Sequence, residues 1–134
     1  MDKTARKGPG RAALYYRYST AEQENSLARQ KSQVEPYTLQ KGYAVVATEQ
    51  DLGIPGNEYE NRPGFLRLME MARRREIDVI VCDDQDRFSR FNPLKFCAVM
   101  SELDEAGVRL ETVSTGVIDT ENFMGLMMAQ LRQH

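Results

Sequence analysis

Hydrophobic and polar positions along the chain switch between two periods, which predicts strands and helices in turn. Apolar runs at residues 12–18, 43–48, 77–82 and 108–113 are typical of buried strands. Between them, apolar residues recur every three or four positions, as in a helix with one buried face. This alternation predicts an α/β domain with a mostly parallel sheet of four to five strands and helices on both faces. We expect functional loops at the carboxyl ends of the strands.

Glycine, proline and asparagine mark the ends of the first two predicted helices. The first covers about residues 26–41, is ended by Gly42, and is expected to kink at Pro36, where a backbone donor is missing. The second is expected to be capped by Asn61, with Pro63 in its first turn. Its core-facing residues are predicted to be Phe65, Leu68, Met69 and Ala72.

The second half of the chain offers two more helices. Asn92-Pro93 opens a helix that ends at Gly107, with Phe96, Val99, Met100 and Leu103 as its core stripe. The stretch 123–131 begins another helix and is apolar almost all round. Two interpretations of that stretch stay open: a terminal helix packed on its own domain, or the start of a long oligomerisation helix. Residues 51–61, with glycines and acidic side chains, are predicted to form a loop.

Composition limits the classes of protein that fit. A chain of 134 residues, 41% of them hydrophobic, suits one domain with its own core. The 18 basic and 20 acidic residues give a net charge of −2, so any DNA affinity must come from local arginines or another segment. Cys82 and Cys97 lie in apolar stretches and are interpreted as buried free thiols, which favours a reducing, cytoplasmic setting. No apolar run approaches a membrane span, and residues 1–11 are expected to form a flexible tail.

Polar clusters follow the predicted strand ends, where an open α/β sheet binds ligands. Guanidinium groups can hold the non-bridging oxygens of a phosphate, a serine can attack phosphorus, and a carboxylate can move the proton. This inventory suits phosphoryl transfer. Each residue also has a structural explanation: Ser19 as a turn residue, Arg62 in a surface ion pair, Asp86 as a helix cap. The candidate site residues are Arg17, Ser19, Gln23, Arg62, Asp86, Arg87 and Arg90.

The sequence carries no signature of a metal or nucleotide cofactor. The single histidine, His134, is terminal, and Asp83-Asp84 lacks partners at a familiar ligand spacing. Gly53 and Gly56 precede no helix in the register of a phosphate-binding loop. We therefore expect chemistry that needs neither a metal nor a cofactor.

Three clusters in this order resemble the serine recombinase family, which comprises resolvases, invertases and large serine integrases. Arg17-Tyr18-Ser19 resembles its Arg-x-Ser, with Ser26 and Gln30 where its next helix has like residues. Asp51-x-Gly53 and Gly56, followed by residues 61–65, resemble the family's mobile loop and the start of its next helix. Residues 86–90 resemble its Asp-Arg-Leu-x-Arg signature. The match runs from Leu14 into the closing helix, and the long middle loop resembles the large integrase and transposon branch.

The resemblance implies a mechanism and its partners. Ser19 would attack a DNA phosphodiester and become joined to the 5′ phosphate, leaving a free 3′ hydroxyl. Asp86 would transfer a proton to the leaving oxygen, and Gln23 would help to position the site. The phosphate would be surrounded by four arginines, namely Arg17, Arg62, Arg87 and Arg90. The family uses no cofactor and acts as a DNA-bound homodimer and a synaptic homotetramer. Residues 12–134 would be its catalytic domain, cut off within the last helix, with the DNA-binding domain absent.

A second hypothesis comes from a different class of protein. The chain could be a non-catalytic α/β interaction or regulatory module, either an inactive recombinase relative or a receiver-like domain using Asp83 or Asp84. A receiver would need a lysine at a later strand end. The segment after Val113 offers Ser114 and Thr115 and no lysine.

Overall fold

A computed structural model describes residues 10–18, 25–53, 62–84, 87 and 93–118, together with Glu121, Gly125 and Ala129. These residues form a five-stranded sheet in the order β2-β1-β3-β4-β5, in which only β5 is antiparallel to its neighbour. The predicted α/β class and mostly parallel sheet are confirmed. The described elements are β1 (Arg11–Tyr18), α1 (Asn25–Lys41), β2 (Ala44–Leu52), α2 (Pro63–Arg73), β3 (Val79–Cys82), α4 (Pro93–Glu105), β4 (Arg109–Thr112) and β5 (Gly116–Val117).

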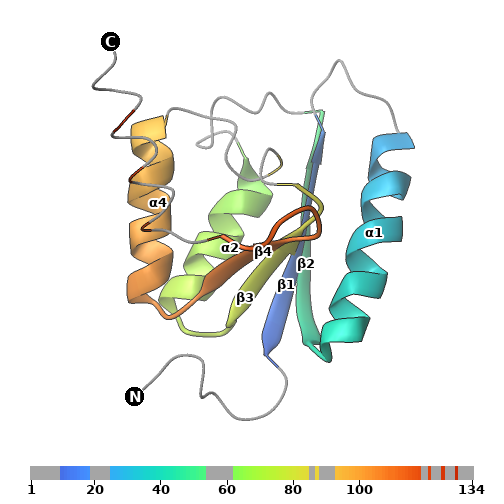
Figure 1. The fold of residues 1–134 in the computed structure, drawn as a ribbon, viewed down its shortest axis with the longest axis horizontal. Coiled ribbons are helices and arrows are strands. Elements are labelled where there is room, and N and C mark those ends of the chain that lie inside the picture. Colours follow the sequence, from blue (N-terminus) through green and yellow to red (C-terminus); the bar gives the residue numbers. More distant parts are fainter. Residues whose placement is uncertain are drawn as a thin grey trace.

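Helices cover both faces of the sheet, as the alternation of elements predicts. Figure 1 shows α1 on one side and α2 and α4 on the other. Successive residues of β1 point to opposite faces, so this strand contributes to two cores. Ala13 and Tyr15 pack with α2 and α4, and Leu14 and Tyr16 pack on the α1 side. The core stripes predicted for the second and third helices are buried, at Phe65, Leu68, Met69 and Ala72 in α2 and at Phe96, Val99, Met100 and Leu103 in α4.

The glycine stops of the first and third helices are confirmed. Gly42 and Gly107 follow α1 and α4 with φ of 76° and 75°, a left-handed conformation that costs a residue with a side chain more than glycine. Helix α1 is continuous through Pro36, the position where a kink is expected. Pro36 is exposed, so its ring faces away from the sheet.

The structure corrects the prediction for the segment between β2 and α2. Strand β2 runs on to Leu52, so Asp51 belongs to the strand and not to the predicted loop 51–61. The residue at the N-cap of α2 is Arg62, whose side chain makes no capping hydrogen bond. Asn61, the expected cap, lies outside the described residues.

The predictions for the two ends of the chain have different outcomes. Strand β1 begins at Arg11, so the expected tail over residues 1–11 extends one residue too far. Its backbone N–H and its guanidinium Nε donate to Oδ2 of Asp78 at 2.8 and 3.0 Å. Most of the stretch 123–131 lies outside the described residues, so neither interpretation of it is tested.

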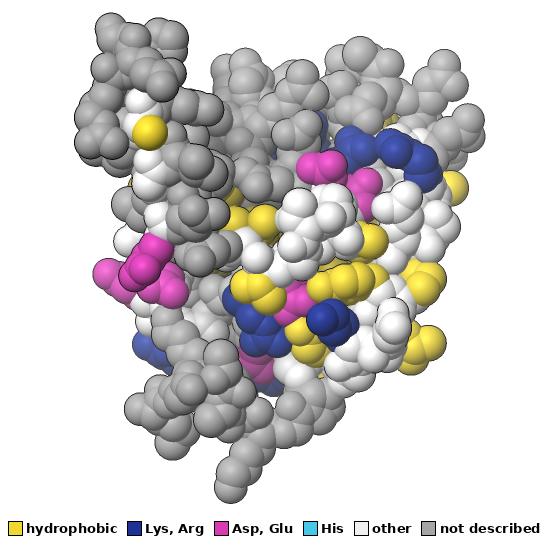
Figure 2. Space-filling view, in the orientation of Figure 1, with side chains coloured by type: hydrophobic (Ala, Val, Ile, Leu, Met, Phe, Trp, Pro, Cys, Tyr) yellow, Lys and Arg dark blue, Asp and Glu magenta, His cyan; other side chains and the backbone are white. Residues whose placement is uncertain are grey.

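A buried polar cluster fastens α1 to β4 on one face of the sheet. Glu111 accepts hydrogen bonds from the hydroxyls of Tyr37 and Tyr43 and from Nε of Arg109. Burial alone would raise the pKa of Glu111, but these hydrogen bonds outweigh it and hold the pKa below its ordinary value. Figure 2 shows acidic and basic side chains set among hydrophobic ones on the visible face of the molecule.

Candidate functional site

The carboxyl ends of β1 and β3 lie side by side and form a topological switch point. From β1 the chain crosses through α1 to β2 on one side, and then through α2 to β3 on the other side. Open α/β sheets bind ligands outside the strand ends at such a point. Arg17 lies near the end of β1, and Arg87 follows β3.

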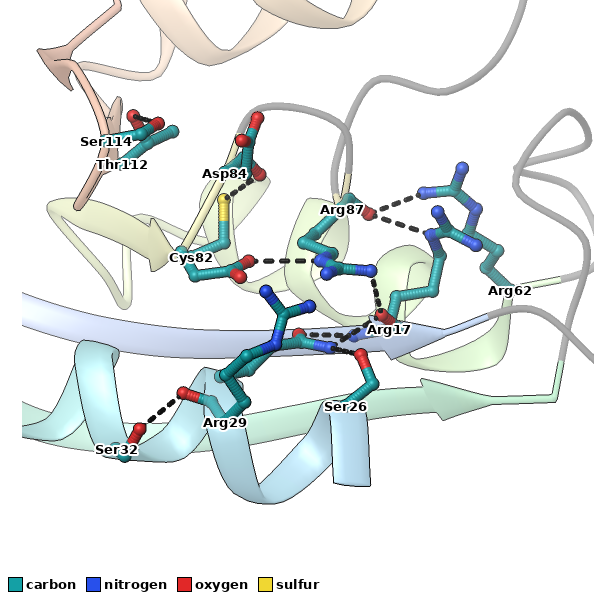
Figure 3. Close-up of polar contacts among 12 residues, drawn as sticks. Arg17, Ser26, Arg29, Ser32, Arg62, Cys82, Asp84, Arg87, Thr112 and Ser114 are labelled. Atoms are coloured by element: carbon teal, nitrogen blue, oxygen red, sulfur yellow. Dashed lines mark hydrogen bonds and ion pairs between the residues drawn. The ribbon is translucent and has the colours of Figure 1, made fainter. Parts of the chain in front are cut away.

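Three guanidinium groups from separate parts of the chain meet at this point (Figure 3). Nε of Arg17 and Nη1 of Arg62 both donate to the main-chain carbonyl of Arg87, each at 3.2 Å. In return, Nη1 of Arg87 donates to the carbonyl of Arg17 at 3.3 Å. Arg17 and Arg62 are only 1% and 0% exposed. Cations concentrated in a buried setting attract an anion more strongly than they would in water.

Gln30 and Ser26 of α1 hold the end of β1 in place. The side-chain oxygen of Gln30 accepts from the backbone N–H of Arg17 at 3.2 Å, and its amide nitrogen donates to the carbonyl of Arg17 at 2.9 Å. The same amide donates to the Ser26 hydroxyl at 3.0 Å. Gln30 is fully buried, and its amide gives the backbone N–H and carbonyl of Arg17 the partners that a neighbouring strand would otherwise supply. Arg17 is the residue just before Tyr18 and Ser19.

Asp51 fixes the start of α2 and thereby the backbone at Arg62. Its carboxylate accepts from the backbone N–H groups of Gly64 and Phe65 at 2.8 and 2.9 Å. These are two of the N–H groups that a helix start leaves without an intrahelical acceptor. A negative charge there is also favoured by the helix dipole. A carboxylate distant in sequence therefore does the work expected of Asn61.

Tyr15 completes the surroundings of Asp51. Its hydroxyl donates to the carboxylate at 2.7 Å. Burial, assisted by Asp51, raises the pKa of Tyr15 despite the opposing charge of Arg62, so the phenol stays protonated and donates. The Arg62 guanidinium lies 5.8 Å from the ring centre of Phe65. Arg62 thus has an aromatic face beside it as well as a fixed backbone.

Asp83 forms an ion pair with Arg87. Its carboxylate accepts from Nε of Arg87 at 3.1 Å, and the two side chains are 6% and 11% exposed. Asp83 is itself fixed to the sheet, because its carbonyl accepts from the backbone N–H of Ser114 after β4. The ion pair therefore connects the Arg87 guanidinium to a residue bonded to the sheet.

The structure brings together three of the seven predicted site residues, namely Arg17, Arg62 and Arg87. It corrects the alternative of a surface ion pair for Arg62, which is buried. Tyr15 and Asp83 were not among the seven candidate residues, and Asp83 was considered only for the alternative of a receiver-like domain. A polar residue at the end of a buried strand was the available signal for Asp83. The predictions for Ser19, Gln23, Asp86 and Arg90 lie outside the described residues.

The described part of the chain contains neither a metal-binding cluster nor a membrane-spanning helix. No group of three or more His, Cys, Asp or Glu side chains there could hold a metal ion. None of the described helices has the length and hydrophobicity needed to cross a membrane. Cys82 is buried and Cys97 is half-buried, and both are free thiols.

Comparison with known proteins gives consistent matches. The family model described as "Resolvase, N terminal domain" matches residues 12–134. The C-terminal catalytic domain of ISC1926 TnpA, an IS607-like serine recombinase, is 32% identical, with 77% of this chain and 70% of that chain covered and a TM-score of 0.68. No curated protein matches the chain.

Two other solved structures share the fold at lower identity. The N-terminal catalytic domain of TP901-1 integrase is 23% identical, covers 90% of each chain and has a TM-score of 0.71. A resolvase family site-specific recombinase from Streptococcus pneumoniae is also 23% identical, with 92% of this chain and 89% of that chain covered and a TM-score of 0.75.

Proposed function

Because the chain belongs to the resolvase family and is a serine recombinase catalytic domain, we propose that it cuts and rejoins DNA through Ser19. The Ser19 hydroxyl attacks a phosphodiester, forms a phosphoserine bond to the 5′ end and releases a 3′ hydroxyl. Rejoining reverses the step, because a 3′ hydroxyl attacks the phosphoserine and restores the diester. The bond energy is kept in the phosphoserine, so no cofactor is required.

The convergence of Arg17, Arg62 and Arg87 is the observation that carries this proposal. The three side chains meet near the end of β1, and Arg17 precedes Ser19 by two residues in the sequence. The transition state of phosphoryl transfer spreads negative charge over the non-bridging oxygens, and planar guanidinium groups bind such oxygens through paired hydrogen bonds. A site built to stabilise that charge needs several arginines on different elements, as found here.

Proton transfer and the remaining contacts are assigned to residues of the same signature. The Ser19 proton must leave as the bond to phosphorus forms, and the departing 3′ oxygen must gain a proton. Asp86 is proposed to donate a proton to the leaving oxygen. Arg90 and Gln23 are proposed to complete the phosphate contacts. Lysine at the arginine positions would keep the charge but lose the planar geometry.

The proposal names DNA as the substrate and further copies of the protein as partners. The net charge of −2 offers no overall attraction to DNA, so the local arginines must supply it within this chain. A dimer on each site and a tetramer at synapsis would bring four serines to four strands.

A covalent adduct assay tests the proposal without knowledge of the target site. The full-length protein is incubated with a supercoiled plasmid library of random inserts, and protein-linked DNA is collected after denaturation. We expect 5′ ends blocked by protein and 3′ ends that a polymerase can extend. Ser19→Ala should abolish the adduct, whereas Ser101→Ala, at an exposed position on α4, should not.

Two results would oppose the proposal. An adduct that persists in Ser19→Ala would place the nucleophile elsewhere. A lack of adduct with the unchanged protein, under conditions where it is folded and binds DNA, would favour an inactive recombinase relative.

A further inference from the structure

We propose that Asp83 is a positioning residue, which orients the Arg87 guanidinium toward the phosphate without touching the phosphate itself. This inference rests on the proposed function. The residue directly follows β3, and it is only 5% exposed. Its role is separate from that of Asp86, which is assigned to proton transfer.

Two contacts fix the plane of the Arg87 guanidinium. Nε donates to Asp83 at 3.1 Å, and Nη1 donates to the carbonyl of Arg17 at 3.3 Å. Because a guanidinium is planar, two contacts at different nitrogens leave it little freedom to rotate. Without Asp83, the side chain would be oriented at Nη1 but could tilt at Nε.

The anchor of this arrangement is the sheet. The Asp83 carbonyl accepts from Ser114 N–H at 3.1 Å, which joins it to the end of β4. The backbone N–H of Arg87 donates to the Asp84 carbonyl at 3.1 Å, so Arg87 is also bonded to the residue that follows Asp83. The chain of contacts runs from β4 through Asp83 and Arg87 to Arg17, near the end of β1. Figure 3 shows its last contact, between Arg87 and Arg17.

Charge considerations separate positioning from phosphate binding. A carboxylate beside Arg87 reduces the local positive potential, so it weakens the attraction for a phosphate. Its removal should therefore leave DNA affinity unchanged or raise it. If Asp83 positions Arg87, the same removal should slow the chemical step, because a misplaced catalytic group loses rate even when the substrate is bound. The two effects have opposite signs.

The test measures rate and affinity for Asp83→Asn in the full-length protein. Single-turnover adduct formation is followed on a duplex of a sequence captured by the unchanged protein, and affinity is measured with the same fluorescent duplex. We expect adduct formation to slow by about ten- to a hundredfold. The dissociation constant should not rise by more than about twofold, since only an unfavourable charge is lost.

Asp84→Asn is the matched control. Asp84 is the next residue along the chain, is exposed, and loses the same charge on substitution. Its adduct formation should stay within about threefold of the unchanged protein, because exposed charges contribute little. Asp83→Glu keeps the carboxylate on a longer side chain and should lie between the unchanged protein and Asp83→Asn. It also tests the role if the asparagine variant does not fold.

The outcomes distinguish this inference from the function on which it rests. Ser19-dependent adducts with an unimpaired Asp83→Asn variant would overturn the positioning role and leave the proposed function intact. Equal slowing in Asp83→Asn and Asp84→Asn, or a loss confined to DNA affinity, would also overturn it. If Asp83→Asn is unfolded, a glutamate variant as fast as the unchanged protein would have the same meaning, because displacement of the carboxylate would then cost no rate. No Ser19 adduct from the unchanged protein would remove both proposals together.

Discussion

Asp51→Asn should destabilise the protein through the start of α2. The carboxylate accepts three hydrogen bonds, from Gly64 N–H, Phe65 N–H and the Tyr15 hydroxyl. An asparagine oxygen can replace the acceptor for Gly64, and the Tyr15 hydroxyl can rotate to accept from the new amide. The Phe65 N–H then faces an N–H group and loses its partner.

The magnitude follows from these losses. A hydrogen bond to a charged group contributes about 1.5–3 kcal/mol, and a charge at a helix start adds about 0.3–1 kcal/mol. We therefore expect the free energy of unfolding to fall by about 2–4 kcal/mol. Native domains have about 5–15 kcal/mol of stability, so the variant should still fold.

Urea unfolding followed by far-ultraviolet circular dichroism measures this change. Glu105→Gln is the matched control, because it removes one negative charge at an exposed position on α4. Its stability should stay within about 0.5 kcal/mol of the unchanged protein. A similarly small change in Asp51→Asn would refute the view that this carboxylate holds the start of α2.

The other predictions concern packing, acid stability and thiol reactivity. Gly64→Ala places a Cβ 3.0 Å from a backbone carbonyl of β2, so it should lower the free energy of unfolding in urea by about 1–3 kcal/mol. A Cβ at Gly125 meets nothing within 4 Å, so Gly125→Ala should not destabilise the protein. Equal losses of stability in the two variants would contradict this reasoning. The pKa of Glu111 is held below its ordinary value of 4.5, so its contribution to stability is present above pH 4.5 and lost as the pH falls through the lower folded value. Glu111→Gln should therefore flatten the acid limb of stability against pH, and parallel curves would count against it. Burial raises the pKa of Cys82, so a thiol reagent should label half-buried Cys97 first, and equal labelling rates would oppose that view.

Periodicity predicted the elements that bury apolar side chains, because burial leaves a regular trace in the sequence. The left-handed turn at Gly42 was predictable for a similar reason, since glycine lacks the Cβ that penalises this conformation. Pro36 does not end α1, which continues through it to Lys41. Its ring lies at an exposed position, where it needs no space within the core.

The parts of the site that sequence reasoning missed depend on contacts distant in sequence. The cap of α2 comes from Asp51, 13 residues before Gly64. A local rule selects the nearest capping side chain and so pointed to Asn61. The ion pair joins Asp83 and Arg87, which are close in sequence. Its connection to the site depends on the hydrogen bond from Arg87 to the carbonyl of Arg17, which is 70 residues away.

Mass spectrometry of the DNA-linked peptide is the most direct test of the central claim. The protein–DNA adduct is digested with protease and nuclease, and the modified residue is located by fragmentation. We predict a 5′-linked nucleotide on the peptide that contains Ser19, attached to the serine oxygen. Attachment to any other residue, such as Tyr18 or Thr20, would contradict the account.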